Sequence, residues 1–138
     1  MRIIRTPILA LAGLLLATAP TRAHHAFQAE FDSNKKIKLV GKVTKMEWIN
    51  PHTWIHIEVI NAEGQAEEWM VEGGTPNVLL RRGFTKNSLE VGTEVIVDGN
   101  LAKNGNRKRA SGLSITFKDG KRLFLGGSNP NDPANRIE

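Results

Sequence analysis

Histidine is the residue type whose placement in this chain points most directly to chemistry. The chain has four histidines, and they are His24, His25, His52 and His56. Imidazole nitrogen is a common ligand of Cu(II), Zn(II) and Ni(II), and the chain contains no cysteine that could supply a thiolate instead. The Irving–Williams order places Cu(II) first for such nitrogen ligands. The predicted chemistry is therefore metal binding, with Cu(II) as the expected ion.

The first 23 residues predict a secretory signal peptide. Arg2 and Arg5 form a positive start, an uncharged apolar run covers residues 8–19, and small and polar residues lead to Ala23. The apolar run of 12 residues is shorter than the roughly 20 that a membrane-spanning helix needs. We therefore expect a periplasmic or secreted protein that keeps no stable membrane anchor after cleavage and whose mature chain begins at His24.

A mature N-terminal histidine offers two metal ligands at once. The α-amine and the imidazole of His24 can close a small chelate ring, and His25 adds a third nitrogen beside them. A fixed site also needs a ligand from the folded body, and His52 is the expected one. His56 is excluded because residues four apart on a strand are separated by roughly 13 Å. The alternatives are a solvated, unused start of the chain and a His52 that only satisfies a turn carbonyl.

This ligand set resembles the histidine brace of secreted copper proteins, in which a mature N-terminal histidine and a distant histidine form a T-shaped site. The likeness covers the ligand set alone, and it extends neither to the fold nor to oxidase chemistry.

The elements that must position these residues are predicted to be strands. Short alternating segments separated by Gly and Asn turns are typical of a small all-β domain. Strands are expected over 36–48, 52–60, 66–73, 95–101, 113–117 and 123–125, with a helix from a Thr75 cap to a Gly83 stop. This order predicts an OB-like barrel of five to six strands over residues 24–125, with one short helix between strands three and four. A β-sandwich or another small barrel is the alternative, and residues 126–138 are expected to form a disordered tail.

Two details of the early strands decide where side chains point. In the first strand the apolar phase changes after Val43, which predicts a bulge near Thr44 or Lys45, with Gly41 allowing a bend. In the second strand Thr53, Ile55, Ile57 and Val59 share one face, and His52, Trp54, His56 and Glu58 share the other.

The charge balance argues against a nucleic-acid partner. The whole chain has a net charge of +5, but residues 1–23 contribute three arginines and no acid. The remainder holds 16 basic and 14 acidic residues, a net charge of +2. The sequence also lacks a nucleophile motif and a metalloprotease motif. Glu68 and Glu72 are expected to be solvated. We therefore predict a binding protein and not an enzyme.

A second interpretation needs no metal. Trp54 and His56 on the outer face of the second strand predict a surface for an oligosaccharide, a peptide or a partner protein, unless Trp54 is buried as part of the core. A third interpretation is an accessory subunit that binds a periplasmic redox enzyme.

Several segments together resemble a bacterial family of short exported proteins that is known only as a domain of unknown function. They are the segments His24–Phe27, Glu30–Asp32 and Glu47–His52, together with Gly74–Asn77, which leads into Leu79–Gly83. The resemblance runs from about His24 to Leu125, and the Trp-x-Asn-Pro-His element is its most specific part. It implies export and a single small domain, and it implies no activity.

Overall fold

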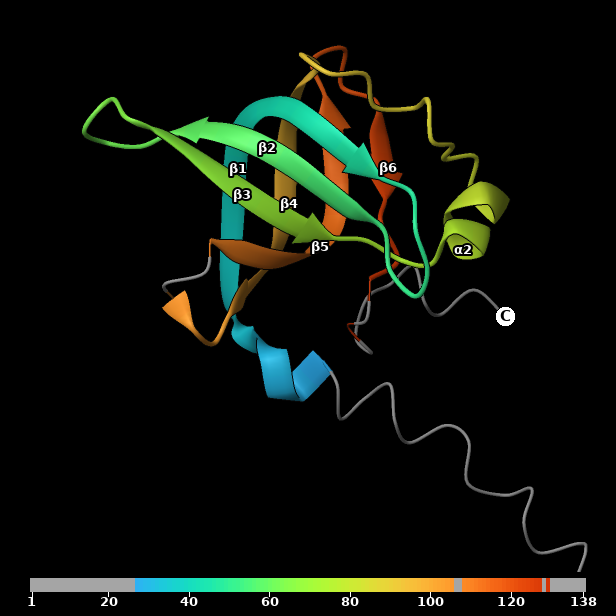
Figure 1. The fold of residues 1–138 in the computed structure, drawn as a ribbon, viewed down its shortest axis with the longest axis horizontal. Helices are drawn as coiled ribbons and strands as arrows, with labels where there is room; N and C mark the ends of the chain where they lie inside the picture. Colours follow the sequence, from blue (N-terminus) through green and yellow to red (C-terminus); the bar gives the residue numbers. More distant parts are fainter. Residues whose placement is uncertain (1–26, 106–107, 128, 130–138) are drawn as a thin grey trace, which may run out of the picture.

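The computed structural model of the protein describes residues 27–105, 108–127 and 129, which form a mostly β domain (Figure 1). Residues 27–30 are helical and lead directly into the first strand. The elements that follow are β1 (Phe31–Glu47), β2 (Trp54–Ile60), β3 (Ala66–Glu72), α2 (Pro76–Arg81), β4 (Glu94–Ala102), β5 (Arg109–Phe117) and β6 (Arg122–Phe124). The predicted signal peptide at 1–23, as well as His24 and His25, lies outside the described residues.

Five of the six strands close into a ring. Neighbouring strands follow the order β3-β2-β1-β4-β5-β6 and are antiparallel, while β3 also pairs with β5 in parallel. The ring therefore runs from β1 through β2, β3, β5 and β4 back to β1, and β6 extends the sheet from β5 as a short edge strand. The prediction of a mostly β domain with five to six strands is confirmed.

The long first strand bends as the sequence predicted. Its pairing with β2 shifts between Val43 and Lys45, which places the bulge at Thr44. Before the bulge Val43 pairs with Ile57, and after it Met46 pairs with Ile55, so the apolar phase stays on the core side. The core inside the ring is built from buried aliphatic and aromatic side chains of every strand except β6, and Leu79 and Phe84 join it from α2 and the segment after α2.

The short helix also has the predicted ends. The Thr75 hydroxyl accepts a hydrogen bond from the Val78 amide at 3.2 Å, Pro76 occupies the first turn, and Gly83 has a φ of 76°. Within the described ranges, no helix reaches the length and apolarity that a membrane crossing requires.

The C-terminal segment differs from the expectation at its start. A disordered tail was expected from Gly126, but Gly126, Gly127 and Asn129 are buried, and Asn129 donates a hydrogen bond to the Asn100 side chain at 3.0 Å. The reason is that the glycines allow a close approach: a methyl group on Gly127 would lie 3.1 Å from the hydroxyl oxygen of Ser111. Residues 128 and 130–138 of the predicted tail lie outside the described residues.

Candidate functional site

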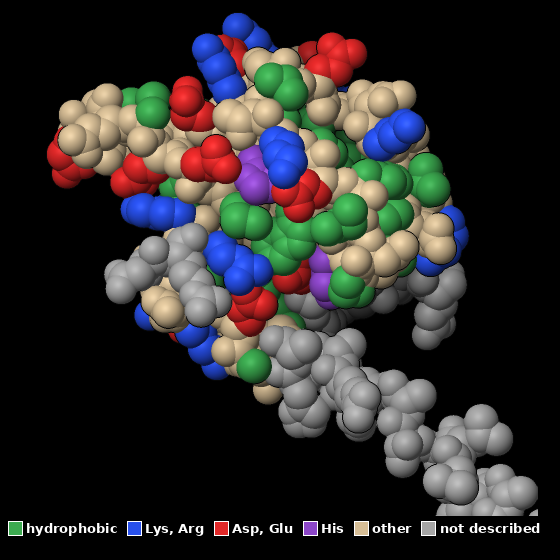
Figure 2. Space-filling model, in the orientation of Figure 1, with side chains coloured by type: hydrophobic (Ala, Val, Ile, Leu, Met, Phe, Trp, Pro, Cys, Tyr) green, Lys and Arg blue, Asp and Glu red, His purple; other side chains and the backbone are tan. Residues whose placement is uncertain are grey.

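The three predicted site residues that the structure describes belong to β2 and the loop before it. Ile55 and Ile57 are buried in the core, so the alternation of β2 turns Trp54 and His56 to the outer face of the ring, with His52 at the mouth of the strand. In Figure 2 both described histidines are visible on this face, among acidic and basic side chains.

The ring of His56 is held between two carboxylates. Its Nδ1 lies 2.9 Å from Oε1 of Glu68 on β3, and its Nε2 lies 3.2 Å from Oε1 of Glu47 on β1. The residue is 7% exposed. Because both ring nitrogens are engaged, His56 offers no free nitrogen to a metal ion in this arrangement.

The ring of His52 is oriented differently. Its Nδ1 lies 3.7 Å from Oε1 of Glu72, which is an ion-pair contact but longer than a hydrogen bond. This nitrogen is buried and has no hydrogen-bond partner among the described residues, while the side chain as a whole is 34% exposed. Because Nδ1 is buried, this exposed surface belongs to the other atoms of the side chain. In metal sites, a histidine often has one ring nitrogen beside a carboxylate while the other nitrogen binds the ion.

Glu72 is buried, which contradicts the expectation that it is solvated. It is 4% exposed, because β3 has neighbours on both sides: Glu72 pairs with Trp54 of β2 and with Ser111 of β5. Ser111 is fully buried, and Gly127 passes close to both residues. The carboxylate therefore faces His52 from within the protein and not from its solvated surface.

Trp54 is partly buried beneath an arginine. The guanidinium carbon of Arg109 lies 4.5 Å from the centre of a Trp54 ring, and its Nη1 lies 2.5 Å from Oε1 of Glu30. Glu30 ends the helical segment that precedes β1. This contact fixes the N-terminal part of the described chain against the same face that carries His52 and His56.

The tryptophans of β2 and β3 do not form a shared stacking platform. Trp54 points outward, whereas Trp69 is buried in the core beside Val71. A flat ligand on the outer face would therefore meet a single tryptophan, one side of which is covered by Arg109.

The neighbours of Glu47 and Glu67 lower the pKa of both carboxyl groups. The pKa of Glu47 is lowered, first by a hydrogen bond from Lys45 and further by the charges of Lys45 and His56. The pKa of Glu67 is lowered by hydrogen bonds from Asn61 and Lys108. The outer face thus carries fixed negative charge beside its histidine and lysine partners.

Sequence reasoning missed the carboxylates and the arginine that surround the predicted residues. A signal for some of them was present: the turn at Asn61–Gln65 fixes the register of the β2–β3 hairpin, and that register pairs Trp54 with Glu72. Arg109 and Glu30 gave no such signal, because their contact depends on the parallel pairing of β3 with β5.

The described residues do not form a complete metal site by themselves. Across 27–105, 108–127 and 129, no group of three or more histidine and carboxylate side chains is placed to hold a metal ion. A site that includes His52 therefore needs ligands from outside these ranges, and both remaining predicted ligands, His24 and His25, lie there.

Comparison with known proteins places the chain in a family without supplying an activity. A family model described as "Family of unknown function (DUF6152)" matches residues 12–113, and the chain belongs to this family. No curated protein and no solved structure matches the chain.

Proposed function

We propose that this member of a family of unknown function is an exported protein that binds Cu(II) through His24, His25 and His52. Cleavage after Ala23 would free the α-amine of His24 next to its own imidazole, with the His25 imidazole as a further nitrogen. His52 would supply a ligand from the folded domain, and this ligand would hold the ion bound by the N-terminal nitrogens in one position.

The orientation of His52 carries this proposal. Its Nδ1 is directed at the buried carboxylate of Glu72, so Nε2 is the nitrogen left for a metal. In metal sites the nitrogen that does not bind the ion usually donates its proton to a carboxylate or carbonyl, which fixes the tautomer and makes the ligand more basic. Glu72 is suited to that positioning role, because burial keeps it in place.

The position of the N-terminal segment also supports the site. Glu30 contacts Arg109, Arg109 covers Trp54, and Trp54, the first residue of β2, lies two residues after His52. Residue 24 precedes the first described residue, Phe27, by three positions, and three extended residues reach about 10 Å. We infer that this reach brings the mature N-terminus to His52.

We also assign the domain to an OB-like barrel. The support is the ring order β1-β2-β3-β5-β4 together with a helix placed between β3 and β4. In this fold class, ligands bind on the face of strands two and three and beside the loops that precede strands two and five. His52 belongs to the first of these loops.

A second candidate function rests on Trp54. Its outward position supports a binding module for an oligosaccharide, a peptide or a partner protein without a metal. We rank it below copper binding, because Arg109 covers one side of Trp54 and Trp69 faces the core.

Cu(II) affinity of two histidine variants tests the proposal. Mature protein that begins at His24 is titrated against a competing chelator, as wild type, as His52→Gln and as His56→Gln. We expect His52→Gln to weaken Cu(II) binding at least about tenfold, since even the outer-shell partners of metal ligands are worth that much. His56→Gln is the matched control, and it should leave the affinity unchanged. Equal affinities for wild type and His52→Gln would contradict the proposal.

A further inference from the structure

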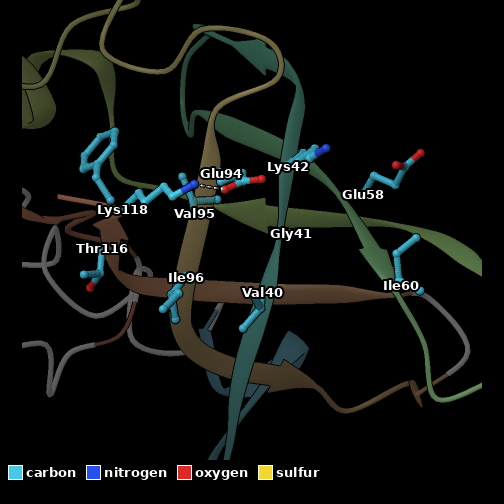
Figure 3. A pocket seen from close by; sticks show the side chains of 11 residues that line it. Val40, Gly41, Lys42, Glu58, Ile60, Glu94, Val95, Ile96, Thr116 and Lys118 are labelled. Atoms are coloured by element: carbon cyan, nitrogen blue, oxygen red, sulfur yellow. Dashed lines mark ion pairs between the residues drawn. The ribbon is translucent and has the colours of Figure 1, made fainter. Parts of the chain in front are cut away.

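A hollow lies on the outer surface of the ring, where β1 passes between β2 and β4 (Figure 3). Its volume is about 660 Å³. Residues of β1, β2, β4 and β5 line it, and none of the residues of the proposed copper site is among them. The lining is mostly apolar on one side and carries charged side chains on the other, as Figure 3 shows.

The apolar part of this surface is unusually exposed for aliphatic side chains. Val40 is 61% exposed and Ile60 is 59% exposed, and Val40 pairs directly with the partly exposed Ile96 across the β1–β4 ladder. All three point away from the core, because the residues next to them in the sequence contribute to it, namely Leu39, Val59, Val95 and Val97. Adjacent exposed aliphatic side chains on a sheet face mark a surface that another molecule covers.

The charges beside these residues are balanced in sign. Lys42 lies opposite Glu58 on β2 and opposite Glu94 on β4, and Lys118 forms an ion pair with Glu94 at 3.4 Å. Lys42 and Glu58 are exposed, and neither forms an ion pair with another described residue. The hollow is thus bordered by two lysines and two glutamates. Lys118 and Glu94 form an ion pair with each other, whereas Lys42 and Glu58 form none with another described residue.

We propose that the surface formed by Val40, Ile60, Ile96, Lys42 and Glu58 binds a second copy of this chain as a two-fold symmetric dimer. In such a dimer the same patch must match itself, so each contact occurs twice with the roles exchanged. A patch with equal numbers of lysines and glutamates satisfies this condition, because Lys42 of one copy can face Glu58 of the other. A strongly acidic or basic partner would instead meet repulsion from half of the charges.

The shape of the patch supports the same conclusion. Val40, Ile60 and Ile96 line the hollow, so each copy would present exposed aliphatic side chains to those of the other. The dimer would cover the exposed aliphatic groups, and His52 is not among the residues that line the hollow. The inference therefore does not depend on copper binding.

Sedimentation equilibrium over a range of protein concentrations tests the dimer. Mature wild-type protein is compared with Val40→Lys and with Leu80→Lys as a matched control. Leu80 is 50% exposed on α2 and does not line the hollow, and both variants change the net charge equally. We expect a wild-type mass that approaches twice the monomer mass, a dimer dissociation constant raised at least about tenfold by Val40→Lys, and no change from Leu80→Lys.

Thermal unfolding of each variant shows whether the monomer fold is intact, and Ile96→Lys repeats the test from the neighbouring strand if Val40→Lys fails to fold. Wild type that stays monomeric at every concentration would overturn the inference. So would a dimer that both Val40→Lys and Ile96→Lys leave intact or that Leu80→Lys weakens equally, and so would a monomer whose hollow is occupied by a detergent or a lipid.

Discussion

His52 and His56 show how neighbours decide what a histidine can do. They lie four residues apart and at the same side of the sheet, yet His56 contacts a carboxylate with each ring nitrogen and His52 with only one. Sequence spacing could separate the two residues in space, but it could not identify their partners. Glu47 and Glu68 reach His56 from strands on either side of β2, and that information lies in the register of the sheet.

Replacement of Glu72 tests the positioning role at the same scale. In Glu72→Gln the His52 ring keeps a neighbour of similar shape but loses the negative charge beside Nδ1. We expect the Cu(II) affinity of the mature protein to fall about 10- to 100-fold, as for other outer-shell partners. Glu58→Gln, on the exposed surface of β2, is the control. An affinity that Glu72→Gln leaves unchanged in a folded protein would remove Glu72 from the site.

The lowered pKa of Glu47 gives a prediction that is independent of metal. Its main cause is the hydrogen bond from Lys45, so Lys45→Gln should raise the pKa of Glu47 toward its ordinary value of 4.5. Because the pKa of Glu47 is lower in the folded state, the stabilisation is present above pH 4.5 and is lost as the pH falls through the folded-state pKa. Carbon-detected NMR of the carboxyl group measures the shift. Lys42→Gln, which changes the same strand, should not produce it.

At the scale of the elements, local signals were sufficient for most of the fold. The phase change after Val43 predicted the bulge, and Thr75 with Pro76 predicted the start of α2. These features depend on residues close in sequence. The burial of Glu72 depends instead on the parallel pairing of β3 with β5 and on the nearby passage of Gly127. Neither contact can be predicted from the sequence of β3 alone.

Gly41 allows the close passage of β1 along β2. A methyl group on this residue would lie 2.1 Å from the carbonyl oxygen of Glu58, which is backbone and cannot rotate away. Gly41→Ala should therefore lower the free energy of unfolding by about 1–3 kcal/mol, as expected for overpacking. Urea denaturation measures the change. Gly105→Ala, where a methyl group would meet no atom within 4 Å, should have little effect, and equal stabilities would contradict the proposed strain.

At the scale of the whole molecule, the proposed site joins two parts of the chain that the sequence keeps far apart. Glu30, Arg109 and Trp54 connect the start of the described chain to the face of β2 and β3. The distribution of charge along the chain predicts export and argues against a nucleic-acid partner, and both stay predictions. It could not reveal that Glu30 contacts Arg109 and that Arg109 in turn covers Trp54 at the start of the second strand.

The free amine of His24 is the central claim, and one comparison of Cu(II) affinities tests it most directly. Protein that begins at His24 is titrated beside protein with one additional alanine before His24, which keeps every imidazole but converts the terminal amine into a peptide nitrogen. We expect the extended form to bind Cu(II) at least about tenfold more weakly, since it loses the chelate ring. Equal affinity of the two forms would contradict the account.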